Sequence, residues 1–195
     1  MALSNQTPRI TEPEYLRGEL VSEVKHEYLN GHVYAMTGAS INHNRIITNL
    51  VRQLGNHLEN TPCEPFSSDM KLKVENNFFY PDVMVVCEAQ SDHEYYTESP
   101  ILIVEVLSKS TRQTDQTLKR LAYQSLSCSK EYVLIEQDFV DVEACRRENH
   151  WQSEHYFLGD TVYFAAIDLH LLVETIYARV NNEEMRAWSE PKNRS

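Results

Sequence analysis

The chain has 195 residues, which is enough for one domain with a sizeable core. Its hydrophobic fraction of 42% and charged fraction of 24% are ordinary for a globular protein and do not fit a disordered chain. No apolar run approaches the roughly 20 residues that a membrane span needs, and the N-terminus lacks a signal-peptide pattern, so we expect a cytoplasmic protein with no membrane partner. The formal net charge of -11 argues against strong non-specific binding to nucleic acid, although a local basic groove could exist.

The cysteines are far apart in the sequence and form no CxxC pair. They are Cys63, Cys87, Cys128 and Cys145. This spacing argues against a zinc site and against a disulfide framework. Cys87 and Cys145 lie in apolar, strand-like runs, where we expect plain core thiols.

The first third of the chain predicts a helix, a hairpin and a second helix. Thr11 followed by Glu14 forms a capping-box pattern, so a short helix should begin near Thr11. "KHEYLNGHVYAMTG" alternates around Asn30-Gly31, a strong hairpin signal. From residue 42 to about 59, apolar residues recur at helical spacing and predict a long amphipathic helix that covers one face of a sheet.

Three strands are predicted next. "SSDMKLKV" alternates strictly, which indicates a half-exposed strand with Asp69, Lys71 and Lys73 on its polar side. "FFYPDVMVVCE" indicates a single apolar strand that contains Asp82. "SPILIVEVLSKST" is typical of a strand buried on both faces, with Glu105 in its middle.

The last part of the chain predicts a strand–helix–strand crossover and an edge hairpin. "TRQTDQTLKRLAYQSL" should form a helix whose apolar face includes Leu118 and Leu121, and "EYVLIEQD" a buried strand parallel to the one before the helix. "DFVDVEACRRENHWQSEHYF" indicates an edge hairpin, and "LLVETIYARV" a closing helix. We expect residues 1–180 to be a single domain and residues 181–195 to be a polar tail that frays.

Glu105 is the most informative residue, because an unpaired carboxylate in a buried strand is costly. Its partner could be a proton, a basic side chain or a metal ion. Asp82 lies in a neighbouring predicted strand, so the two acids could share a divalent cation. Asp115, Lys119 and Tyr123 recur at four-residue spacing on the following helix, which would let Lys119 reach over the sheet toward the acids.

Residue chemistry alone supports a second interpretation equally well. Asp82 and Glu105 could be paired with Lys119 in a buried ion-pair network that holds no metal. Lys119 could also be an ordinary solvated surface lysine, and Asp69 could simply face solvent beside its neighbouring lysines.

The ordered set "YPD", "IVEVLS", "ST" and a helix reading "DxxxKxxxY" resembles the PD-(D/E)XK nuclease superfamily, and more specifically its Uma-two family of restriction-endonuclease-like proteins. The resemblance covers nearly the whole chain, including "HEYLNGHVY", "INHNRIITNLVRQL" and "EYVLIEQD". It implies an α/β fold: a restriction-endonuclease-like mixed β-sheet flanked by α-helices, here with an added N-terminal hairpin and C-terminal strands. It also implies magnesium-dependent hydrolysis of DNA phosphodiester bonds, by a homodimer when both strands are cut.

Carried over to this chain, the resemblance makes Asp82 and Glu105 the ligands of Mg²⁺, with Mn²⁺ as a substitute. The lysine of the superfamily, two residues after the second acid, falls here on Leu107. Lys119 fits the place to which some family members move that lysine, and Lys109 is a poorer substitute at the strand end. Asp82, Glu105 and Lys119 are therefore the expected catalytic residues.

Four further residues are expected in supporting roles. His43 and Glu27 match positions that often recur in the family, Asp69 could lie in the second shell of the metal, and Tyr123 lies on the lysine stripe. The alternative function is a nuclease fold that has lost hydrolysis and serves as a binding or regulatory module. Leu107 at the lysine position and the acidic net charge both favour this alternative.

Overall fold

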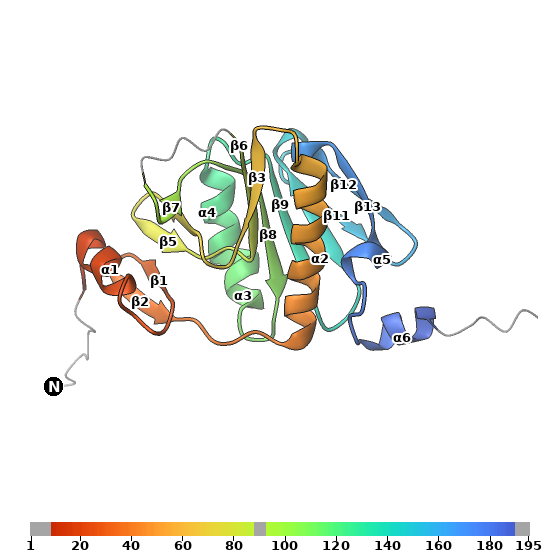
Figure 1. Cartoon of the computed structure of the whole chain (residues 1–195), viewed down its shortest axis with the longest axis horizontal. Helices are drawn as coiled ribbons and strands as arrows, with labels where there is room; N and C mark the ends of the chain where they lie inside the picture. Colours follow the sequence, from red (N-terminus) through yellow and green to blue (C-terminus); the bar gives the residue numbers. More distant parts are fainter. Residues whose placement is uncertain (1–8, 88–92, 190–195) are drawn as a thin grey trace, which may run out of the picture.

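The computed structural model describes residues 9–87 and 93–189. A six-stranded sheet in the order β11-β10-β9-β8-β6-β3 forms its centre (Figure 1). The strands are β3 (Cys63–Ser67), β6 (Val83–Cys87), β8 (Pro100–Leu107), β9 (Glu131–Glu136), β10 (Val142–Arg146) and β11 (Ser153–Tyr156). β8 and β9 run parallel and the other neighbours antiparallel, so the sheet is mixed, as the family resemblance implied.

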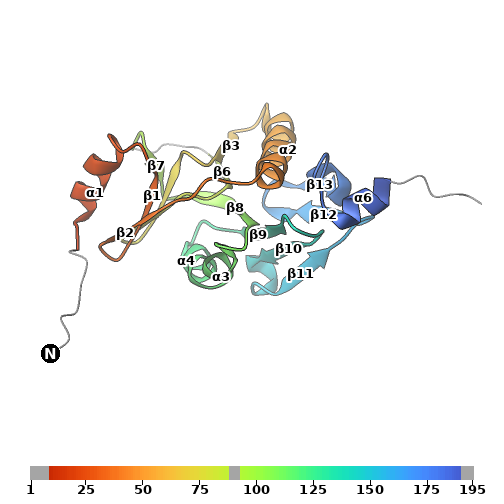
Figure 2. The same cartoon turned by 90° about the horizontal axis from the view of Figure 1, so that it is seen from below.

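Helices cover both faces of this sheet (Figure 2). α2 (Ile41–Leu58) packs on one face, where Ile46, Leu50 and Leu54 join the main core. The segment between β8 and β9 covers the other face. It consists of α3 (Arg112–Thr114), the π-helical turn η1 (Asp115–Lys119) and α4 (Arg120–Ser125). The predicted fold class and the predicted parallel crossover are thereby confirmed.

A second sheet, in the order β2-β1-β5-β4-β7, carries the N-terminal hairpin. Its strands are β1 (His26–Leu29), β2 (His32–Ala35), β4 (Lys71–Val74), β5 (Asn77–Phe79) and β7 (Tyr96–Thr97). Asn30 and Gly31 form the predicted two-residue turn, both with positive φ (51° and 89°), as a type I′ hairpin requires. α1 (Glu12–Glu19) covers one face of this sheet, and its predicted capping box is present.

The C-terminal part adds a small sheet of β12 (Thr161–Phe164) and β13 (Leu169–Leu172), two 3₁₀ turns, η2 (Arg147–Asn149) and η3 (Ala165–Ile167), and two helices, α5 (Val173–Ile176) and α6 (Glu183–Ser189). The predicted edge hairpin is confirmed by β10 and β11. The predicted closing helix is only one turn long, because its first residues pair in β13. Fraying of the whole tail is wrong for residues 183–189, where Met185 of α6 is buried; residues 190–195 lie outside the described ranges.

Pro81 divides the single strand predicted from "FFYPDVMVVCE" into two. β5 ends at Phe79 in the second sheet and β6 begins at Val83 in the main sheet. Because proline has no N–H group, it cannot continue a ladder on both sides, and the chain changes sheet at this point. Asp82 therefore lies at the junction of the two sheets.

β3 was not predicted, since Pro65 interrupts its short sequence. Proline is tolerated there because β3 is the edge strand of the sheet. β3 places Cys63 directly opposite Cys87 of β6, and the two form a disulfide. The expectation of no disulfide was wrong, because 24 residues separate the cysteines and only the strand pairing brings them together. Cys145 is buried and free, as expected.

Within the described ranges, no helix is long and apolar enough to cross a membrane.

Two glycines give opposite predictions for stability. Gly31→Ala should lower the free energy of unfolding by about 1–2 kcal/mol, because φ is +89° and a Cβ atom would lie 3.1 Å from Cβ of Arg9. Gly18→Ala should raise it by about 0.5–1 kcal/mol, because Gly18 is helical and a Cβ atom there would meet nothing within 4 Å. Urea unfolding of both variants measures the two changes, and changes of the same sign would contradict the turn geometry.

Candidate functional site

Asp82 and Glu105 lie side by side, and each side chain accepts a hydrogen bond from a backbone amide of the segment that carries the other. Val83 of β6 pairs with Val104 of β8, which sets Asp82 next to Glu105. The Asp82 amide donates a hydrogen bond to Oε2 of Glu105 (3.3 Å), and the Val106 amide donates one to Oδ2 of Asp82 (2.7 Å). The predicted juxtaposition of the two acids is thus observed.

Lys119 reaches over the sheet to Glu105, as its spacing predicted. Its Nζ atom lies 3.1 Å from Oε1 of Glu105, 2.9 Å from Oε1 of Glu27 and 3.3 Å from Oδ1 of Asp115. The Tyr123 hydroxyl donates to the same Oε1 of Glu105 at 3.0 Å. One buried ammonium therefore joins three carboxylates from three different elements.

The structure also distinguishes between the candidate lysine positions. Leu107 is buried in the core between the sheet and α4 and lies on the same face of β8 as Glu105. Lys109 is exposed in the turn after β8. Lys119 is thus the lysine that contacts the acids.

The helix that carries Lys119 faces the sheet with a different side from the one predicted. Leu118 and Leu121 are 43% and 72% exposed, whereas Asp115, Lys119 and Tyr123 are buried. The polar stripe faces inward because Glu105 needs partners that an apolar face would not supply. The π-helical turn spans Asp115 to Lys119, and turns of this kind occur often at functional sites.

Two supporting residues from the N-terminal part complete the cluster. Glu27 lies on β1, and its Oε1 also accepts a hydrogen bond from the Tyr80 amide (3.2 Å). His43 lies in the first turn of α2, which Ser40 caps through the His43 amide, and His43 Nε2 is 3.1 Å from Oδ2 of Asp82. The hairpin and the long helix thus both contribute to the site.

Asp69 is not part of the cluster. Its side chain is 83% exposed and forms an ion pair with Lys25. No described contact joins Asp69 to Asp82 or Glu105, so the structure does not support its expected place in the second shell of the metal. We found no sequence signal that separates Asp69 from Glu27, because the strand alternation around both residues is similar.

Burial dominates the electrostatics of the site. It raises the pKa of Glu105 well above the usual value; Lys119 opposes this rise, and the nearby charges of Asp115, Asp82 and Glu27 add to it. Burial likewise raises the pKa of Asp115. Burial alone would lower the pKa of Lys119, but its three carboxylate partners raise it well above the usual value, so this lysine carries its charge.

The donor set suits a hard divalent cation. Three carboxylates, those of Glu27, Glu105 and Asp115, contact a single lysine ammonium, and the carboxylate of Asp82 lies beside Glu105, so the carboxyl groups outnumber the lysine in a buried place. Magnesium commonly binds through one or two carboxylates and keeps several waters. Within the described part of the chain, no three acidic, histidine or cysteine side chains are grouped to enclose a metal. Two protein ligands, Asp82 and Glu105, with open remaining positions, are compatible with both observations.

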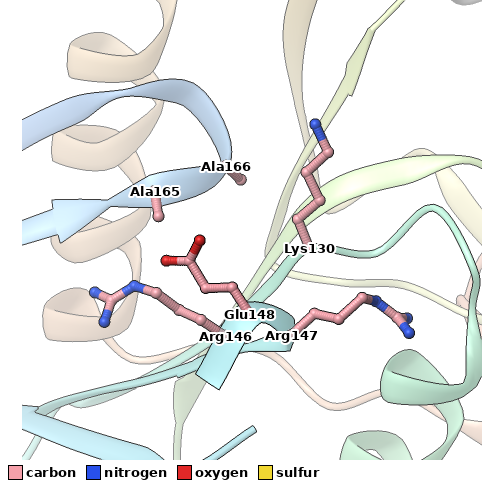
Figure 3. Close-up of a pocket in the computed structure, with 6 residues that line it drawn as sticks. All are labelled: Lys130, Arg146, Arg147, Glu148, Ala165 and Ala166. Atoms are coloured by element: carbon pink, nitrogen blue, oxygen red, sulfur yellow. The ribbon is translucent and has the colours of Figure 1, made fainter. Parts of the chain in front are cut away.

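A separate cavity of about 250 Å³ lies away from this cluster and is lined by Lys130, Arg146, Arg147, Glu148, Ala165 and Ala166 (Figure 3). Its arginines are already engaged. Arg146 binds the carboxylates of Glu131 and Glu154, and Arg147 donates to backbone carbonyls. We therefore assign it no part in the site around Glu105.

Comparisons with known proteins agree on the family. The sequence pattern of Uma2, described as "Putative restriction endonuclease", matches residues 12–171. Two uncharacterized proteins of Synechocystis sp. strain PCC 6803 are 33% and 36% identical to the chain. The first match covers 87% of this chain and 92% of the relative, and the second covers 75% and 82%.

One solved structure has a similar fold. It is a crystal structure from Anabaena variabilis, titled as a putative nuclease belonging to DUF820, and it superimposes with a TM-score of 0.72 at 19% identity. The match covers 86% of this chain and 97% of that one. Because the family pattern spans most of the chain and the relatives match over nearly their whole length, the chain belongs to the Uma2 family of putative restriction endonucleases, the family that its motifs resemble.

Proposed function

We propose that the protein is a metal-dependent endonuclease of the PD-(D/E)XK type that hydrolyses DNA phosphodiester bonds. The observation that carries this proposal is the pairing of Asp82 and Glu105 across neighbouring strands, with Lys119 in contact with Glu105. Family membership supports action on nucleic acid. The excess of carboxylates over cations supports the need for a divalent metal.

Each residue of the cluster has a separate task in this proposal. Asp82 and Glu105 would hold one or two Mg²⁺ ions, which Mn²⁺ can replace, and the bound ion would activate water and neutralise charge on the phosphate. Lys119 stabilises the negative charge that develops on the phosphate during attack. Tyr123 and Lys119 fix the position of Oε1 of Glu105, and His43 fixes Oδ2 of Asp82.

Hydrolysis of a duplex adds one requirement. A single active site of this kind cuts one strand, so cutting both strands of a symmetric target calls for two copies of the chain. We therefore propose that the active form is a homodimer.

Neutralising either metal ligand should abolish both metal binding and cleavage. Asp82→Asn and Glu105→Gln keep the shape of each side chain but remove its charge, so calorimetry should detect no Mn²⁺ binding, and plasmid nicking in Mg²⁺ should fall at least about a hundredfold. Asp69→Asn is the matched control, since it removes the same charge from an exposed acid outside the cluster. It should leave both measurements unchanged.

A different result would favour the alternative function. If the wild-type protein binds no Mn²⁺ and cuts no plasmid, a binding or regulatory protein on a nuclease fold is the better account. The burial of Leu107 at the position of the usual lysine is the observation that favours this alternative.

Removing Lys119 should destabilise the fold even before activity is considered. Lys119→Met leaves three buried carboxylates without their shared cation, so the free energy of unfolding in EDTA should fall by about 3–5 kcal/mol. Lys130→Met, which removes an exposed lysine, should change it by less than about 0.5 kcal/mol.

A second variant tests whether the pairing causes the loss. The double variant Lys119→Met/Glu105→Gln should lose less than the sum of the two single variants, because each single change leaves a charged or polar partner unpaired. Strict additivity in urea unfolding would show that Lys119 and Glu105 do not stabilise each other.

A further inference from the structure

Lys71 of β4 is a buried cation that forms no direct ion pair with any described residue. The residue is only 6% exposed, and within the described ranges its ammonium makes no ion pair or hydrogen bond. Burial lowers its pKa. The strand alternation predicted a solvent-facing lysine here, so the structure differs from expectation. Because a buried, unpaired ammonium costs free energy, its presence calls for an explanation outside the fold.

Two tyrosine rings border the Lys71 ammonium. Nζ lies 5.4 Å from the centre of the Tyr80 ring and 5.9 Å from that of Tyr95. Such cation–π contacts offset part of the cost of burial but supply no negative charge. Tyr95 is 49% exposed, so this group of side chains reaches the surface on the side of that ring.

The neighbouring charged groups make their direct contacts with residues other than Lys71. The negative charge of Glu19 raises the pKa of Lys71. The Glu19 carboxylate itself accepts hydrogen bonds from the His26 amide and the Tyr80 hydroxyl. Lys25 packs over the same Tyr80 ring but forms an ion pair with Asp69. Among the described residues, Lys71 thus makes no direct ion pair, and Glu19 acts on it only from a distance.

The segment that forms this group leads directly into the proposed active site. Tyr80 is followed by Pro81 and Asp82, and the Tyr80 amide donates to Glu27 of the acid cluster. An extended chain advances at most about 3.3–3.6 Å per residue, so the backbones of Tyr80 and Asp82 lie within about 7 Å. Lys71 therefore packs against a residue that lies two positions before Asp82 in the chain.

We infer that Lys71 binds a backbone phosphate of a nucleic-acid strand and that the exposed ring of Tyr95 stacks on a base of that strand. Lysine to phosphate and aromatic ring to base are the contacts that proteins use for single strands. The inference rests on the proposed function, which it deepens by locating where the strand is held outside the acid cluster.

The test compares two lysines of the same strand. Lys73 lies two residues from Lys71 on the same face of β4, but its Nζ is paired with Glu12. Fluorescence anisotropy with a labelled single-stranded oligonucleotide in EDTA measures affinity without cleavage. Lys71→Met should weaken binding about tenfold and lower the salt dependence by about one ion. Lys73→Met, which removes the same formal charge, should weaken it less than about twofold.

Further variants separate this inference from the proposed function. Tyr95→Ala should weaken binding at least about fivefold through lost stacking. Asp82→Asn should not weaken oligonucleotide binding, because it removes a negative charge, but it should abolish cleavage in Mg²⁺. If neither the wild type nor any variant cleaves DNA but Lys71→Met still weakens oligonucleotide binding, the proposed endonuclease function is wrong and the proposed Lys71 contact is supported. If cleavage depends on Asp82 and Lys71→Met binds normally, the strand contact fails alone. Competition by inorganic phosphate as effective as by the oligonucleotide would overturn the assignment to a strand.

The melting temperature of Lys71→Met separates a lysine kept for binding from one kept for structure. Replacing a purely structural lysine would lower Tm, whereas replacing a binding lysine should raise it. Methionine fills a similar volume without a charge, so Lys71→Met should raise Tm. Higher stability with weaker binding is the mark of a residue kept for function at the expense of the fold. A lower Tm with unchanged affinity would show instead that Lys71 is held for its contacts with Tyr80 and Tyr95, and would overturn the inference.

Discussion

The buried ammonium of Lys119 is the interaction on which the arrangement of the site depends. Glu27 belongs to the N-terminal hairpin, Glu105 to the central strand of the main sheet, and Asp115 to the same helix as Lys119. Each of these carboxylates would be expensive to bury alone, and a single cation makes their burial tolerable. The same contact therefore fixes the second sheet, the main sheet and the crossover helix relative to one another.

Pro81 has a complementary effect on the backbone. By ending one ladder at Phe79 and letting the next begin at Val83, it leaves Tyr80 and Asp82 at the boundary between the sheets. Asp82 is then free to hydrogen bond with the Val106 amide and to meet His43, while the Tyr80 amide points to Glu27. A continuous strand would have used these backbone groups in its own ladder, and the acids would have lost part of their positioning.

Local signals predicted most of the fold and the centre of the site. The Asn30-Gly31 turn, the periodicity of α2 and the buried strand around Glu105 each depend on residues close in sequence. What depends on distant partners was missed. The disulfide requires β3 to pair with β6, the outward direction of Leu118 and Leu121 requires the acids that draw the opposite side of the helix inward, and the burial of Lys71 requires the rings of Tyr80 and Tyr95.

Lys71 matters for binding because the chain as a whole is acidic. With a formal net charge of -11, the protein as a whole repels a phosphate backbone, and the excess carboxylates of the site add to this repulsion. A surface lysine that already has an acid partner, as Lys73 has, presents little net charge to an approaching strand. Among the described residues, Lys71 has no direct acid partner, so its charge is offset only by the more distant Glu19, and the low dielectric of its surroundings strengthens its field. In a protein of this charge, attraction for nucleic acid must come from a few uncompensated cations rather than from a broad basic face.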